Sequence, residues 1–390
     1  MRERDQTQCG AGPWYPLGTV PRFSLPLLAA REVATTRCTY CPKLCRPACP
    51  VTEAEGRETS SPWGIMRALG EIAAVAEDPS GVGARAAMAW SCTGCRGCRE
   101  LCLLDNPVAD TVWDARADAF AAGLAPTAVR DYARGHASRM AKLREGVSVD
   151  FSEVPAGDGR AVFVPGCSML AREPETALRG ARALAKLRGG VRVLTGACCG
   201  APLLDAGDRE GFHRAAREFL AAVGDATEVI LGDAGCAFTL RRRYSEMGLF
   251  PPRWTRAEHV SEFASRHLDA LGRVDDPREV VIHDACRLGR GLGVYDAPRA
   301  VLHALRGDPP KELPEHHARG RCSGGGGLLP VVHPATAKVV GGDLADAVRE
   351  VVDPAGAVVV TSCPTSRAQL RAQGVASEDL LDWIARAQGV

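Results

Sequence analysis

The chain has 390 residues, of which 46% are hydrophobic, and its formal net charge is +1. This length allows two or three domains with hydrophobic cores, and the near-neutral charge predicts no nucleic-acid partner. The first ten residues contain no apolar signal region, and no later run reaches the roughly 18 apolar residues of a membrane span. We therefore expect a cytoplasmic protein that could be peripheral to the inner face of a membrane through a partner. Its 16 cysteines predict metal binding, catalysis or burial rather than disulfides, because cytosolic thiols are kept reduced.

The first 145 residues predict an irregular arm followed by a helical domain with two cysteine runs. Residues 1–30 are rich in proline and aromatic residues and form the arm. The first run, CTYCPKLCRPACPV, contains Cys38, Cys41, Cys45 and Cys49. A helix is expected next, because Ser61 can cap it, Pro62 fits its first turn, and apolar residues 65, 66, 69 and 72 share one face. The second run, SCTGCRGCRELCLLDNPV, contains Cys92, Cys95, Cys98 and Cys102, and helical periodicity continues over 109–145.

From residue 158 onward the sequence alternates between strands and helices. RAVFVPGC, VRVLTGACCG and TEVILGDAGC are separated by helical segments, and EVVIHDACRLGR, RCSGGGG and AVVVTSCPTS repeat the pattern. We expect an α+β multidomain protein, with the helical domain over 31–145 and two duplicated α/β (Rossmann-like) modules over 158–272 and 278–390. Cysteines follow the predicted strands, at the sheet edge where α/β proteins bind ligands.

The two cysteine runs predict two [4Fe–4S] clusters. The second run has the spacing C-x2-C-x2-C-x3-C of bacterial ferredoxins, in which the fourth cysteine ligates the other cluster. By this crossed rule, one cluster takes Cys38, Cys41, Cys45 and Cys102, and the other takes Cys92, Cys95, Cys98 and Cys49. Two departures are a third residue in the first run's middle gap (PKL) and Leu103 in place of proline. Two zinc sites are the alternative, although zinc knuckles are usually separated by a dozen or more residues.

The chain resembles the family of glycolate oxidase iron–sulfur subunits and heterodisulfide reductase catalytic subunits. The resemblance rests on the paired runs within residues 31–110, on PGCSML…ACCGAPLLDAG…GDAGC, and on HDACRLGRGLGVYDAPR…RCSGGGG…TSCPTS. It implies two ferredoxin-type clusters, followed by a duplicated cysteine-rich "CCG" domain. It also implies electron transfer between an FAD-containing partner and a quinone, thiol–disulfide or similar acceptor. In heterodisulfide reductases each CCG module is associated with a non-cubane [4Fe–4S] centre held by five cysteines.

Measured against that pattern, both modules lack ligands. The first has Cys167, Cys198, Cys199 and Cys236, with Thr239 where the fifth cysteine is expected. The second has Cys286, Cys322 and Cys363, with Ser323 and Ser366 in place of cysteines. Serine is a poor iron ligand because its oxygen is hard and its pKa is high. We expect that the first module could still hold a further Fe–S centre and that the second holds a weakened centre or none. Buried structural thiols are the alternative for both sets.

Several other residues have open roles. Cys198, Cys199 and His283 are the catalytic candidates, although a histidine beside an aspartate at a strand end, as in His283–Asp284, is more often a hydrogen-bonded structural pair. Arg287 and Arg290 flank Cys286 and could lower the pKa of its thiol or bind an anionic acceptor.

Two further segments predict no ligand. His316 and His317 lie in a polar loop and are expected to be solvated. The glycine run 324–327 lacks nucleotide-binding spacing and is expected to form a flexible turn.

The function expected first is that of an iron–sulfur electron-transfer subunit in a multi-subunit oxidoreductase. A disulfide reductase working at the first module's cysteines is the second hypothesis. A non-enzymatic iron–sulfur or zinc scaffold that senses redox state is the third. Thr239, Ser323 and Ser366 favour electron conduction over disulfide chemistry.

Overall fold

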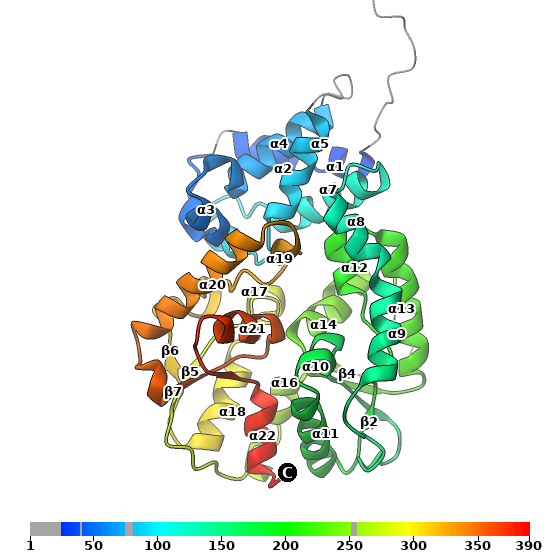
Figure 1. The fold of residues 1–390 in the computed structure, drawn as a ribbon, viewed down its shortest axis with the longest axis vertical. Coiled ribbons are helices and arrows are strands. Elements are labelled where there is room, and N and C mark those ends of the chain that lie inside the picture. Colours follow the sequence, from blue (N-terminus) through cyan, green and yellow to red (C-terminus); the bar gives the residue numbers. More distant parts are fainter. Residues whose placement is uncertain (1–24, 40, 75–80, 251–255) are drawn as a thin grey trace, which may run out of the picture.

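The computed structural model of the chain describes residues 25–39, 41–74, 81–250 and 256–390. Two α/β modules stand side by side, most of the helical N-terminal domain lies above them, and its last two helices (residues 127–146) run down beside the first module (Figure 1). Within these described ranges, no helix combines the length and apolar character that crossing a bilayer would require.

The N-terminal domain is built from short helices around an apolar centre. They are α1 (Pro26–Ala29), α2 (Glu32–Thr39), α3 (Pro50–Glu55), α4 (Pro62–Ala74), α5 (Val82–Ala87), α6 (Gly97–Glu100), α7 (Val108–Ala121), α8 (Thr127–Arg134), α9 (His136–Gly146), and the 3-10 turns η1 (Arg46–Ala48), η2 (Glu58–Ser60) and η3 (Met88–Ser91). Helix α4 starts as the sequence predicts, because the backbone N–H of Gly64 donates to the Ser61 hydroxyl at 3.0 Å. The predicted apolar face of α4 is buried.

The end of the arm predicted over residues 1–30 differs from expectation. Residues 1–24 lie outside the described ranges, but residues 26–29 form α1 rather than irregular chain. Leu28 is fully buried, and its backbone N–H donates to the Asp118 carboxylate on α7 at 2.8 Å. Burial of one leucine and capping by one carboxylate therefore order a segment too short to be recognised from periodicity.

The first module is a parallel four-stranded sheet with helices packed on it. Its elements are β1 (Ala161–Val164), α10 (Cys167–Arg172), α11 (Pro174–Arg188), β2 (Arg192–Val193), α12 (Ala201–Ala206), α13 (Arg209–Val223), β3 (Glu228–Leu231), α14 (Ala234–Phe238), η4 (Thr239–Arg243, a π-helical turn), α15 (Tyr244–Glu246), β4 (Arg256–His259), α16 (Val260–Ser265) and η5 (Leu268–Ala270). The strand order is β2-β1-β3-β4. Strand β1 is buried at every residue and β3 at all but its first, as expected for a parallel sheet covered on both faces.

The second module repeats this topology. Its elements are β5 (Glu279–Ile282), α17 (Gly289–Leu292), α18 (Asp296–Arg306), β6 (Lys311–Glu312), η6 (His317–Arg319), α19 (Leu329–Val332), α20 (Pro334–Arg349), η7 (Pro354–Gly356), β7 (Ala357–Val360), α21 (Pro364–Ala372), β8 (Ser377–Glu378) and α22 (Leu380–Ala387). All strands are parallel, in the order β6-β5-β7-β8. Matching order in the two sheets agrees with the predicted duplication. The finer Rossmann-like assignment stays a prediction.

Strands β4, β6 and β8 were absent from the sequence prediction. Their sequences, RAEH, KE and SE, contain no apolar run. Each lies at the edge of its sheet, where short, charged strands are common. Their pairing depends on neighbouring strands rather than on their own composition.

The two modules share one core and a buried ion-pair network. Helix α22 packs against α11, and its Trp383 is fully buried. Arg367 on α21, also fully buried, donates from Nε to the Glu173 carboxylate of the first module at 3.0 Å and from Nη1 to the carbonyl of Thr361 at 2.8 Å. Asp379 is its third partner. Because removing one partner of such a network leaves a buried charge uncompensated, these contacts hold the modules in one arrangement.

Candidate iron–sulfur and thiol sites

The first candidate group combines one cysteine run with the last cysteine of the other. The electrostatic neighbours of the Cys38 thiol are Cys45, Cys41 and Cys102. Burial raises the pKa of Cys38 to about 11, although a hydrogen bond from the Asn106 side chain opposes this effect. Asn106 Nδ2 lies 3.0 Å from Cys38 Sγ. The structure thus brings Cys102 to the first run, as the crossed rule requires.

The second candidate group is the reciprocal set. The neighbours of the Cys98 thiol include Cys92, Cys95 and Cys49. Burial raises the pKa of Cys49 to about 12, against hydrogen bonds from Thr52, and the thiols of Cys95 and Cys92 raise it further. Cys49 is therefore separated from its own run and joins the loop of residues 92–98.

Both groups suit an iron–sulfur cluster in their donor chemistry. Each offers four sulfur donors and partly or fully buried side chains. Backbone N–H groups also point at the sulfurs, from Gly94 to Cys92 Sγ at 3.3 Å and from Asn106 to Cys102 Sγ at 3.4 Å. Hydrogen bonds to cysteine sulfur are one of the features by which proteins set cluster potentials. Four thiols alone would also suit zinc, so the donor set does not separate the two metals.

Two cysteines of the second module, Cys286 and Cys322, lie near the second candidate group, which contains Cys95. Cys322 is hydrogen-bonded to both Cys95 and Cys286. This bond lowers the pKa of Cys286 to about 7, against burial, and Arg290 and Arg287 lower it further. The same two contacts raise the pKa of Cys322, and its Sγ lies 3.6 Å from the Thr93 hydroxyl. The three thiols form a continuous contact between the two domains.

A cavity of about 230 Å³ opens beside this contact. Cys95, Cys322 and Arg290 line it, together with residues of η1, α3, α6 and α20 and of the segment 315–321, which includes η6. Its charged groups are nearly balanced, with Arg290, Arg319 and Arg321 facing Glu53, Glu100, Glu315 and Asp343. It is therefore suited to a small acceptor of low net charge rather than to a polyanion.

Ser323 and Ser366, the two serines that stand in place of cysteines in the second module, are hydrogen-bonded to each other. Ser323 Oγ and Ser366 Oγ are 2.8 Å apart and buried. Cys363 Sγ lies 3.2 Å from the Thr365 hydroxyl. The positions that would hold two further ligands therefore form a hydroxyl pair, and whether this module holds a centre stays a prediction.

The first module gathers all four of its thiols. Cys167 Sγ lies 3.7 Å from Cys198 Sγ, and Cys199 Sγ lies 3.4 Å from Cys236 Sγ. Cys198 and Cys199 are also hydrogen-bonded to each other. Thr239 turns its hydroxyl away to the carbonyl of Gly235, at 2.8 Å within its own helix. The four sulfurs fit a further centre in number and softness, whereas Thr239 does not complete a set of five.

A buried carboxylate connects all three parts of the chain, and sequence reasoning missed its role. Asp205 on α12 accepts hydrogen bonds from Trp113 Nε1 of the N-terminal domain at 3.0 Å and from Arg287 Nη2 of the second module at 2.8 and 2.9 Å. Arg116, fully buried, donates to the carbonyls of Asp205 and Cys92. Asp205 lies within the APLLDAG segment of the family motif, but nothing local identifies its distant partners.

The glycine run 324–327 makes a close contact that the sequence did not reveal. A Cβ at Gly327, whose φ is +62°, would collide with the carbonyl oxygen of Cys92, and one at Gly326 would lie 2.9 Å from the carbonyl oxygen of Thr93. Nearby, His333 Nε2 lies 3.1 Å from the Ser91 hydroxyl. These glycines therefore let the second module approach the ferredoxin loop, and the flexible turn expected from the sequence is instead a docking contact.

We predict that Gly327→Ala weakens this docking. The matched control is Gly293→Ala, because Gly293 has a similar φ of +75° but open space around its Cβ position. The control carries only the backbone penalty of about 1–3 kcal/mol, whereas Gly327→Ala adds a collision with Cys92. We expect a lower apparent Tm and faster proteolysis between the domains for Gly327→Ala than for the control. Equal values would show that the contact does not hold the domains together.

The remaining candidates from the sequence have mixed outcomes. His283 is buried, and its ring nitrogens lie 3.0 Å from the Thr361 hydroxyl and 3.0 Å from the carbonyl of Arg321. Both nitrogens are thus engaged, and the expected side-chain pair with Asp284 is replaced by these partners. Arg290 donates from Nε to the carbonyl of Cys95 at 2.6 Å. Arg290 therefore positions the loop of residues 92–98 and also lowers the pKa of Cys286.

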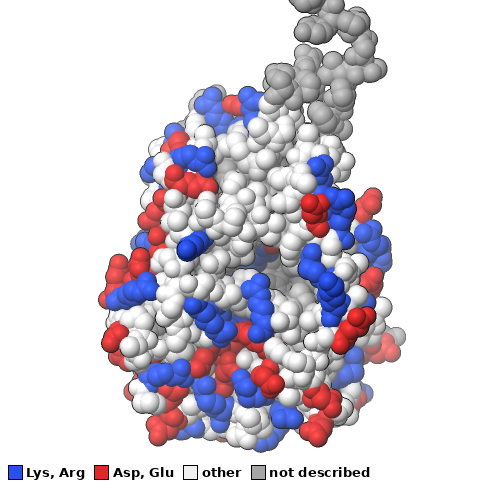
Figure 2. Space-filling view, in the orientation of Figure 1, with Lys and Arg blue, Asp and Glu red and all other residues white. Residues whose placement is uncertain are grey.

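The outer surface near these groups is uneven in charge. Figure 2 shows a hollow near the centre of one face, below the N-terminal domain and between the modules, with Lys and Arg side chains around it. A hollow surrounded by cations is a favourable approach for an anionic group or an acidic partner surface.

Comparison with known proteins identifies two kinds of domain in the chain. A model of the 4Fe-4S dicluster domain matches residues 34–105, and a model of the cysteine-rich CCG domain matches twice, over residues 161–241 and 280–371. The dicluster match favours iron–sulfur clusters over zinc in the N-terminal domain. No solved structure matches the chain.

Two kinds of curated relative are similar to the chain. A fumarate reductase (CoM/CoB) subunit from Methanothermobacter marburgensis is 28% identical over 330 residues, covering 82% of this chain and 64% of the relative. Lactate utilization protein A 1 of Bacillus cereus is 29% identical over 143 residues, covering 34% of this chain and 58% of the relative. The matched regions therefore span less than two thirds of either relative's length.

Proposed function

Because the chain belongs to the CCG-domain iron–sulfur proteins, we propose that it is the iron–sulfur subunit of a multi-subunit oxidoreductase. In this role it relays electrons between a flavin-containing partner and an acceptor at the CCG modules. The clusters supply one-electron redox centres when bound. The chain's own residues position them, exclude water and present the acceptor site.

The observation that carries this proposal is the thiol contact between domains. The Cys322 thiol of the second module is hydrogen-bonded to the thiol of Cys95, in the loop of residues 92–98, and to that of Cys286. Arg290 fixes the same loop through the carbonyl of Cys95, and Gly327 allows the close approach. Electrons leaving the cluster at Cys95 would therefore have a short route into the second module and to the adjoining cavity.

The relatives support a redox assembly with a two-electron substrate. One is named as part of a fumarate reductase, and the other as a lactate utilization protein. Flavins exchange hydride equivalents, whereas iron–sulfur centres carry single electrons, so a flavin-containing partner would connect such substrates to this chain.

A disulfide reductase remains the second candidate, and the first module favours it. Its four thiols are gathered and largely buried. Against it stand the hydroxyl of Thr239, turned to the backbone, and the closed pair Ser323–Ser366. These residues leave neither module with the five cysteines of a disulfide-splitting centre.

The experiment separates the two candidates by their acceptors. Anaerobic holoprotein is reduced with photoreduced FMN, as a stand-in for the flavin partner, and mixed with either duroquinone or 2-hydroxyethyl disulfide. Each acceptor takes up two electrons and two protons, giving a quinol or two thiols. Reoxidation is followed through the visible absorbance of the clusters.

We expect reduction by the flavin and fast reoxidation by duroquinone, with little reaction with the disulfide. Fast reoxidation by the disulfide and slow reaction with the quinone would instead support the reductase. Failure of FMN to reduce the clusters would overturn the relay.

A further inference from the structure

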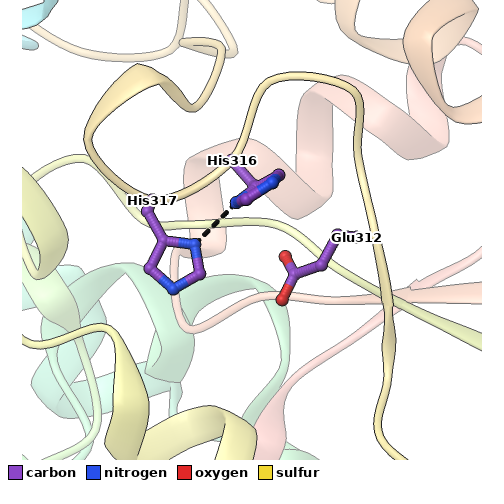
Figure 3. A group of neighbouring side chains, drawn as sticks. All are labelled: Glu312, His316 and His317. Carbon is purple, nitrogen blue, oxygen red and sulfur yellow. Dashed lines mark hydrogen bonds between the residues drawn. The ribbon is translucent and has the colours of Figure 1, made fainter.

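Three side chains with metal-binding chemistry converge in the second module, and none of them belongs to the cysteine groups. Glu312 at the end of β6, His316 and His317 at η6 place one ligand atom each within 4.8 Å of one another. Figure 3 shows the Glu312 carboxylate directed toward the two imidazoles. The Nδ1 atoms of His316 and His317 are 2.7 Å apart. At that distance one ring donates an N–H to the lone pair of the other, and each ring has a second nitrogen that can serve as a ligand.

The surroundings hold two of the three residues in place. His317 has a φ of +55°, in the left-handed region that non-glycine residues rarely adopt. Its backbone N–H donates to Asp284 Oδ2 at 2.6 Å, and its ring packs against Tyr295 with centroids 5.4 Å apart. Arg299 donates to both Glu312 oxygens at 2.7 and 2.8 Å. Ligating carboxylates and histidines are commonly supported in this way by outer partners.

The local charge favours a cation despite the arginine. Arg299 also donates to both Asp284 oxygens, at 2.8 and 2.9 Å. Two carboxylates therefore share one guanidinium, which leaves one negative charge beside the imidazoles. His316 is exposed to solvent, so an ion can enter and keep a water ligand.

We propose that Glu312, His316 and His317 bind one first-row divalent metal ion, of which zinc fits best. Two imidazoles and one carboxylate are the ligand set of open, three-residue zinc sites, in which a fourth position faces solvent. Imidazole nitrogen also disfavours magnesium and calcium, which prefer oxygen ligands. None of the three residues belongs to a cysteine group, although their neighbours Glu315, Ala318 and Arg319 line the cavity beside Cys95 and Cys322. The loop of this site continues to the carbonyls of Ala318 and Gly320, which accept hydrogen bonds from Arg290 at 3.0 and 2.6 Å.

The test compares zinc uptake by full-length holoproteins with equal iron content. Each protein is dialysed anaerobically against chelator-buffered Zn²⁺, and bound zinc is counted by mass spectrometry of the metals. The variant is the double replacement His316→Ala/His317→Ala. The matched control is His303→Ala, an exposed histidine on α18 outside the three-residue group. Zinc taken up by cysteines is common to all the proteins and cancels in the comparison.

We expect the unmodified protein and the control to bind one more zinc per chain than the double variant. Glu312→Gln, which keeps both imidazoles, should weaken the extra zinc by roughly tenfold or more, and it serves as the readout if the double variant fails to fold. Equal zinc in the unmodified and double-variant proteins, or unchanged affinity in Glu312→Gln, would overturn the site.

Discussion

Cys49→Ser is expected to remove the cluster of the Cys92–Cys98 loop and to spare the cluster nearer to Cys49 in sequence. The structure separates Cys49 from its own run and places it beside Cys92 and Cys95. Two [4Fe–4S] clusters contain about eight irons, so we expect the iron content to fall to about four per chain. EPR of the reduced protein identifies which cluster remains.

The reciprocal variant is the matched control. Cys102 lies with Cys38 and Cys45, so Cys102→Ser should remove the other cluster and leave the opposite EPR signal. Loss of the nearer cluster in each variant would show that the ligation is not crossed. Stoichiometric zinc without acid-labile sulfide would contradict both clusters.

The second large effect concerns the two CCG modules. The double replacement Cys198→Ser/Cys199→Ser should abolish any iron bound beyond the two ferredoxin clusters, because it removes two of four gathered thiols. Cys322→Ser should keep that iron, since Cys322 belongs to a module whose other positions are closed by the Ser323–Ser366 pair. Cys322→Ser should instead alter the EPR line shape of the cluster held by Cys95, because the Cys322 side chain is hydrogen-bonded to Cys95.

Iron content and electron transfer to an artificial acceptor check this comparison. Equal iron loss in the two variants would mean that both modules contribute to one shared centre. If the unmodified protein contains no more iron than its two ferredoxin clusters account for, the thiols of the first module hold no cluster.

Features encoded within a short window were predictable from the sequence. The cap at Ser61 and the buried face of α4 follow from local capping and helical spacing. The strands β1, β3, β5 and β7 are short apolar runs. The cysteine spacing predicted which thiols gather, including the exchange of Cys49 and Cys102, because a tight loop can direct only three sulfurs to one point.

Features that depend on distant partners were not predictable. Asp205 joins Trp113 and Arg287, which lie 92 and 82 positions away in sequence. The contact of Gly327 with Cys92 and the pairing of Ser323 with Ser366 likewise require the tertiary fold. The sequence indicates that these serines replace ligands, but only the structure shows that they satisfy each other. His316 is exposed, as its polar loop predicts, whereas His317 is partly buried. The contacts of His317 with Asp284 and Tyr295 are not visible in a loop sequence.

The close contact of residue 327 with Cys92 also has a consequence for when the ferredoxin cysteines are accessible during synthesis. Residues 92–98 are largely buried once the second module is docked on them. During synthesis the ferredoxin cysteines leave the ribosome first, and at about 5–20 residues per second the docking segment follows on the order of ten seconds or more later. A scaffold protein that delivers iron and sulfide would therefore meet the loop uncovered while the C-terminal module is unfinished. After docking, residue 327 covers the loop at Cys92, and Cys95 lines the cavity of about 230 Å³ beside the contact.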